Sequence, residues 1–254
     1  MTIHSTHSMK KSITFIAALC TLGMSFTACD DGHVDDPVYE HTSDGYEVQI
    51  TGTFKSLDTW TGAYSVVAGA FDDESEYSLI QKVLPSSATD STTEVITLSN
   101  VSIDSKTLEI AVVNTLRKRI ATIYSYDIPE NQRLDDTIKI NVGTLNVGMF
   151  GAIDQFIFQG TGTNCSRCHS SAEGAGHLDL TSANAYASLV GKTAYKDSTQ
   201  TRILPGDAEG SFLYKVITQG DEHVSYSHQG LFTDEKYAAF LDIIASWING
   251  GAKE

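Results

Sequence analysis

The hydrophobic pattern of this 254-residue chain changes its period near position 148, and that change limits what the chain can fold into. Before this position, apolar and polar residues alternate in short runs, as in Val48–Ile50, Leu108–Val112 and Ile138–Val142. Polar turns separate these runs. Alternation with period two predicts β-strands that bury one face.

After position 148 the apolar residues recur with helical spacing. The strongest pattern begins after Thr233 and ends at two glycines, with five large apolar side chains on one face: Tyr237, Phe240, Ile243, Ile244 and Trp247. We therefore expect a multidomain chain. An N-terminal antiparallel β-sandwich with an immunoglobulin-like arrangement would cover residues 45–147, and a small all-α domain would cover residues 148–254.

The first 28 residues have the composition of an export signal. Lys10 and Lys11 precede an apolar run from Ile13 to Phe26, and no acidic residue occurs before Cys29. The run is too short to span a bilayer and has the length of a signal-peptide hydrophobic region. We expect residues 1–28 to be removed after export.

Small residues directly before Cys29 resemble the lipobox of bacterial lipoproteins, although Phe26 stands where that family usually has leucine. The resemblance implies that Cys29 carries lipid and anchors the protein to a membrane. The acidic, polar segment 29–44 is typical of a flexible tether. It is similar to the export signal of surface-exposed lipoproteins, which implies the outer membrane of a Gram-negative cell envelope. An ordinary secretory signal cut near Ala28, which leaves Cys29 free, stays open.

The charge of the chain is strongly negative. Removing the predicted signal takes away two lysines and no acidic residue, so the formal net charge falls from −15 to −17. Such a charge repels nucleic acid and anionic lipid and favours basic partners. A solubilising acidic surface is the plainer interpretation of the same composition.

The most specific motif is Cys165-Ser166-Arg167-Cys168-His169. A C-x-x-C pair within one turn puts both thiols on the same side, where they can add to the two vinyl groups of one haem, and the next histidine can bind its iron. The motif predicts one covalent haem c. Zinc would need two more ligands, for which His223 and His228 are available. A redox-active dithiol would need a thioredoxin-like context, which the sequence lacks.

The region from Met149 to Ala252 resembles the class I cytochrome c domains of the planctomycete-type family. The resemblance is carried by Phe150–Ile153 before the motif, Leu178–Thr181, Leu204–Asp207, Ser211–Tyr214 and Trp247–Ala252. It implies that the all-α domain is a cytochrome c domain, with Trp247 packed in its core. It also implies that the Pro205 carbonyl accepts a hydrogen bond from Nδ1 of His169. A plain loop role for Pro205 is an equal alternative.

The sequence departs from many class I cytochromes at the sixth iron position, because no methionine follows Met149. The segment His228-Gln229-Gly230 is similar to a family variant in which a His-Gly-Gly stretch replaces the methionine loop. His228 is therefore our first distal ligand, His223 the second and His177 a distant third. Five-coordinate iron stays open.

These features predict an electron carrier rather than an enzyme, with an unidentified redox protein as its partner and no nucleic-acid partner. An open iron site would instead favour a haem-based sensor or a peroxidase-like protein. In a third hypothesis the sandwich binds glycan or protein through Trp60 and Tyr64, and the cytochrome is accessory.

Overall fold

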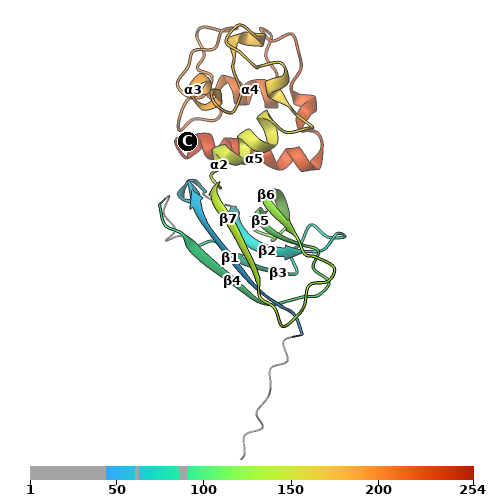
Figure 1. Ribbon diagram of the computed structural model, residues 1–254. Coiled ribbons are helices and arrows are strands. Elements are labelled where there is room, and N and C mark those ends of the chain that lie inside the picture. Colours follow the sequence, from blue (N-terminus) through green and yellow to red (C-terminus); the bar gives the residue numbers. More distant parts are fainter. Residues whose placement is uncertain (1–43, 61–62, 86–90) are drawn as a thin grey trace, which may run out of the picture. The chain divides into compact units, whose positions relative to one another are not determined.

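The computed structural model describes residues 44–60, 63–85 and 91–254 (Figure 1). The predicted signal segment, Cys29 and all but the last residue of the predicted tether lie outside the described residues. Within the ranges that are described, no helix is both long enough and apolar enough to cross a membrane.

One sheet contains three strands in the order β4, β1, β7. β1 covers Tyr46–Lys55, β4 covers Glu94–Val101 and β7 covers Ile138–Asn146. In β1 every second side chain is buried, from Tyr46 through Phe54, which agrees with the alternation in the sequence. β1 pairs antiparallel with β4 but parallel with β7.

The other sheet contains four antiparallel strands in the order β3, β2, β5, β6. Their bounds are Ile80–Val83 for β3, Tyr64–Phe71 for β2, Thr107–Asn114 for β5 and Arg119–Asp127 for β6. The two central strands, β2 and β5, are buried on both faces. One face of β5 places Leu108 and Ile110 in the core shared with β1 and β7, and the other places Ala111 and Val113 in a smaller cluster.

The chain after β7 contains short helices joined by long loops. The α-helices are α2 (Met149–Ile153), α3 (Ala185–Leu189), α4 (Phe212–Thr218) and α5 (Glu235–Asn249). A π-helical turn, η2, covers Asp154–Phe158, and the 3₁₀ turns are η3 (Cys165–Arg167), η4 (Ala175–His177) and η5 (Gln229–Phe232), with η1 (Leu57–Thr59) between β1 and β2. Isolated bridges such as Ser170 with Asp179 and Val190 with Ile203 fasten the loops.

The predicted fold class is therefore wrong. The described chain is mostly β-sheet, with seven strands in two sheets and four short α-helices, and no small all-α cytochrome c domain is evident in it. The predicted sandwich is not purely antiparallel either, because β1 and β7 run parallel. The division at residues 1–28, 29–44, 45–147 and 148–254 stays a prediction.

Apolar packing explains why no separate helical core forms. One buried cluster contains Val112 and Ala121 of the four-stranded sheet together with residues of α2, α3 and α5, such as Ile153, Leu189 and Phe240. Helices of five to seven residues bury too little surface to stabilise themselves and depend on tertiary contacts. The helices and the sheet therefore complete one another's core.

Trp60 and Tyr64, the residues of the glycan-binding hypothesis, contribute to this packing. The Trp60 indole Nε1 donates a hydrogen bond to the Val147 carbonyl, and both rings pack against the cluster that contains α5. Their ring centroids lie 6.4 Å apart. The Tyr64 hydroxyl lies 3.4 Å from the Ala239 carbonyl. Both side chains are partly buried by these contacts.

Candidate functional site

The cysteine motif lies on the tight turn η3. Asn164 enters the turn with a left-handed φ of 41°, and the Cys165 carbonyl accepts hydrogen bonds from the backbone N–H groups of Cys168 and His169. The turn gathers the two thiols and the imidazole at one wall of a single cavity. The spacing in the sequence thus places these three side chains together, as the motif requires.

Both thiols are free, and they lie in different surroundings. Cys168 is exposed, whereas burial raises the pKa of the Cys165 thiol to about 11. At neutral pH the Cys165 thiol is therefore protonated. Cys165 is therefore not itself an activated nucleophile, because the nucleophilic form of cysteine is the thiolate.

His169 is held in one orientation by the chain. Its Nδ1 lies 2.7 Å from the carbonyl oxygen of Ala175 in η4, so that Nδ1 carries the proton and Nε2 keeps its lone pair for a metal. The family resemblance implied this orienting role for Pro205, with a plain loop role as an equal alternative. In the structure Ala175 has it, because the loop after the motif folds back on itself, with the Ala175 N–H bonded to the Cys168 carbonyl.

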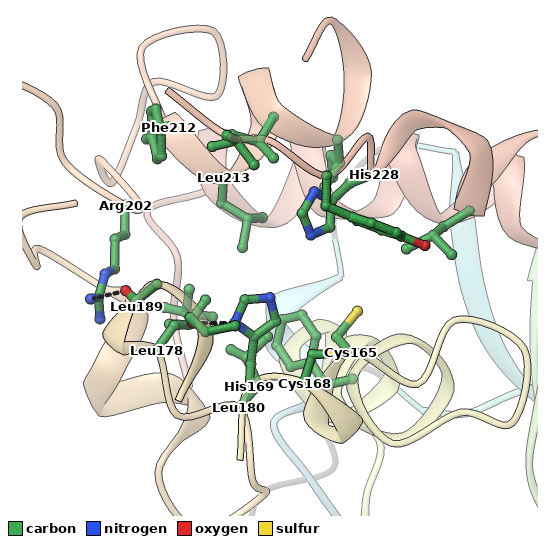
Figure 2. Close-up of a pocket in the computed structure, with 18 of the residues that line it drawn as sticks. Cys165, Cys168, His169, Leu178, Leu180, Leu189, Arg202, Phe212, Leu213 and His228 are labelled. Carbon is green, nitrogen blue, oxygen red and sulfur yellow. Dashed lines mark hydrogen bonds between the residues drawn. The ribbon is translucent and has the colours of Figure 1, made fainter. Parts of the chain in front are cut away.

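His228 faces His169 from the opposite side of the cavity (Figure 2). The ring centroids are 6.1 Å apart and the rings are inclined by 30°. Two imidazoles that bind one metal ion at about 2 Å each place their centroids roughly 6 Å apart. The observed separation leaves room for one metal ion between the two rings.

His228 lies in a poorly solvated environment. Burial lowers the pKa of its imidazole, and the neighbouring His169 lowers it further, while a contact with the Tyr226 backbone opposes the change. Nδ1 of His228 is buried and has no hydrogen bond of normal geometry to any described residue. The ring of Tyr226 packs edge-on against it at 5.0 Å. The neutral imidazole that results is the form that binds metals.

The other two histidines proposed as distal ligands lie elsewhere. His223 is about half exposed, and its Nδ1 lies 2.9 Å from the Asp221 carboxylate, which raises the pKa of the imidazole. His177 stacks on Tyr195 with a centroid distance of 3.9 Å. Neither side chain lines the cavity, whereas His228 does.

The cavity has a volume of about 510 Å³, which lies within the ordinary range for cofactor sites. Most of its wall is apolar, and the side chains come from segments far apart in the sequence: Ile157, Phe158, Leu178, Leu180, Leu189, Phe212, Leu213, Val216, Ile217, Leu231, Phe232 and Ile244. Arg202 and Lys196 bring positive charge to it. A flat apolar ring with polar substituents at one edge suits such a wall.

Sequence reasoning missed three residues of this site. Ala175 orients His169 through its backbone, which no side-chain pattern reveals. Tyr226 and Arg202 line the cavity without any motif of their own. Their one signal is position, because Tyr226 precedes His228 by two residues and Arg202 precedes the Leu204–Asp207 segment of the family resemblance by two.

A bare metal site is not supported by the donor set. Among the residues that the structure describes, no three His, Cys, Asp or Glu side chains are placed to hold a metal ion. His223, one of the two further ligands considered for zinc, does not line the cavity. Two facing imidazoles suit a metal whose other ligands come from a cofactor. Neither a protein-family model, nor a curated protein, nor a solved structure matches this chain.

Proposed function

We propose that this protein carries one covalently attached haem c and transfers single electrons in the cell envelope. The observation that carries the proposal is the pair of facing imidazoles, His169 and His228, 6.1 Å apart in a cavity that Cys165 and Cys168 also line. Each of these elements is needed for a bis-imidazole haem c, and the sequence motif and the cavity geometry are independent reasons for it.

Each residue has a defined task in this proposal. Cys165 and Cys168 would hold the haem covalently through two thioether bonds. His169 would bind the iron through Nε2 while Ala175 fixes its ring, and His228 would supply the second imidazole. The haem supplies a one-electron couple whose potential depends on its axial ligands and on its burial.

The electron-carrier function is preferred over the sensor and peroxidase alternatives because both axial positions have an imidazole available. A gas sensor or peroxidase needs an open iron position. The apolar wall also excludes water from the ring and lowers the reorganisation that accompanies each change of charge. No substrate is required by this arrangement.

The cellular location belongs to the same proposal. Attachment of haem c takes place outside the cytoplasm, and the predicted export signal directs the chain there. Lipid on Cys29 would then hold the protein at the outer membrane, and the acidic segment after it would act as a spacer. The net charge of −17 favours a redox partner with a basic surface.

The test is to produce the full chain together with a c-type cytochrome maturation system. We expect haem staining that survives denaturing electrophoresis, together with a low-spin spectrum. The ferrous protein should not bind carbon monoxide at neutral pH.

The distal ligand is tested with His228→Ala, which should give a high-spin ferric spectrum and carbon monoxide binding. His223→Ala is the matched control and should behave like the parent protein. Carbon monoxide binding by the parent would replace the electron carrier with the sensor or peroxidase alternative, and the absence of covalent haem would refute the proposal.

A further inference from the structure

Arg202 is a cationic side chain in the apolar cavity, and no carboxylate of the described chain lies within ion-pair distance of it. Its guanidinium is partly buried, and burial lowers its pKa. A partly buried charge without a counterion loses some of its hydration, and a ligand that supplies an opposite charge can compensate for that loss. This makes Arg202 the polar feature of the cavity that most needs an explanation.

The backbone holds Arg202 in place from both sides. Its N–H donates to the Lys192 carbonyl, and its own carbonyl accepts from the N–H of Leu213 at the start of α4. The side chain is also fixed: Nη1 donates to the Ser188 carbonyl at 2.7 Å and Nη2 to the His177 carbonyl at 2.8 Å, with a longer bond to Gly176. The guanidinium is thus preorganised and not free to leave the cavity.

These three bonds leave donors to spare. A guanidinium has five N–H groups, and all the recorded partners are neutral carbonyl oxygens. Carbonyls orient the group but do not neutralise its charge. The planar fork of arginine suits a carboxylate better than any other common ligand group.

The position of Arg202 agrees with the chemistry of a haem. Cys165 and Cys168 lie at one end of the cavity and Arg202 at the other, with the His169 and His228 rings between them (Figure 2). In haem c the two thioether carbons and the two propionate carboxylates occupy opposite edges of the porphyrin. The end of the cavity far from the cysteines is therefore where carboxylates are expected.

We propose that Arg202 forms a carboxylate-binding subsite that takes a haem propionate and keeps it ionised. This inference rests on the proposed function, because it names the part of the cofactor that the far end of the cavity recognises. Lys196, which is exposed at the same cavity, is not the main partner, because it is not held by the chain in the way that Arg202 is.

The test uses the haem-loaded full chain and follows the reduction potential from pH 5 to 9. An ionised propionate stabilises the ferric state, so the potential changes with pH wherever the propionate titrates. In the parent we expect no step between pH 5.5 and 8. In Arg202→Gln the propionate pKa should rise by about 1–3 units, at least a tenfold gain in proton affinity, which brings a step into this range. Arg202→Lys should keep most of the parent behaviour.

Other groups that titrate near Arg202 must be separated from this step. They are His177 of η4, Lys192, Tyr195 and Lys196 of the following loop, and Lys215 of α4, whose ammonium donates to Gln200. Since His177 is the histidine among these groups, the series is repeated with His177→Gln. Lys196→Gln tests whether the exposed lysine holds the carboxylate, and Arg117→Gln, at a residue that does not line the cavity, controls for the lost charge.

Two results would overturn the carboxylate subsite while haem is attached normally. The first is a pH dependence of the reduction potential in Arg202→Gln that is identical to those of the parent and of Arg117→Gln, together with thermal stability lowered equally in Arg202→Gln and Arg202→Lys. This outcome is expected for a residue that only donates hydrogen bonds to backbone carbonyls. The second is a pH-dependent step in the reduction potential of the parent that remains after His177→Gln. This result would overturn the subsite even if the Arg202→Gln variant does not accumulate. Absence of covalent haem in the parent would instead refute the proposed function, and the subsite with it.

Discussion

Replacing His228 with leucine should make the haem-free chain more stable, although it removes a proposed ligand. Nδ1 of His228 is buried and has no hydrogen bond of normal geometry to any described residue, and an unsatisfied buried polar group costs about 1–3 kcal/mol. The contact of the imidazole with the Tyr226 backbone offsets part of this cost. Leucine would face a cavity wall that is mostly apolar. The edge-on contact with Tyr226 is lost, at a cost of about 0.5–1 kcal/mol. The net expectation is a gain of about 1 kcal/mol in the free energy of unfolding.

The assay is urea unfolding of haem-free protein at pH 8, where the imidazole is neutral, followed by circular dichroism. His223→Leu is the matched control, because that side chain is exposed and bonded to Asp221; its effect should stay within about 0.5 kcal/mol. A His228→Leu variant less stable than the parent by about 1 kcal/mol or more would refute the reasoning. In the haem-loaded protein the order should reverse, because the lost iron bond outweighs the gain.

Three further results are expected. Changing both Cys165 and Cys168 to alanine should abolish haem staining after denaturing electrophoresis, and staining that persists would contradict the attachment site. Cys29→Ala should move the protein from the membrane to the soluble fraction, since the lipid is its proposed anchor; continued sedimentation would point to another anchor. Asp221 raises the pKa of His223, so their pair contributes stability below about pH 6.5 that is lost as the pH rises through the raised pKa. The stability difference between the parent and His223→Gln should therefore shrink from pH 6 to pH 8.5, and an unchanged difference would argue against it.

Period-two alternation was sufficient to find the strands but not their pairing. The alternation of β1 and β7 gave the strands and their buried faces correctly. It could not show that these two strands run parallel, because a buried face looks the same whichever way its neighbour runs. Strand direction is decided by the connections between strands, which lie in polar turns with little pattern of their own.

The part of the chain after β7 was less predictable, because loops and local hydrogen bonds define much of its structure. Its first element, Met149–Ile153, is an α-helix that continues as a π-helical turn over Asp154–Phe158. The loop after the motif is fastened by side chains bonded to nearby groups, such as Asp179 with Thr181 and Asn184. Local bonds of this kind leave no hydrophobic period in the sequence. The strongest helical pattern, after Thr233, did yield a helix, α5.

The site was more predictable than the fold because its chemistry depends on a few residues at short spacing. The turn η3 needs only five residues to bring Cys165, Cys168 and His169 together, so the sequence reveals it directly. The rest of the cavity depends on how distant segments pack: Leu189 and Ile244, which line it, belong to the same buried cluster as Val112 of β5. The sheet therefore helps to hold the wall in place. This gives the β-strands a structural role in the site, whatever else they bind, because a cavity lined by short helices and loops would collapse without a rigid neighbour.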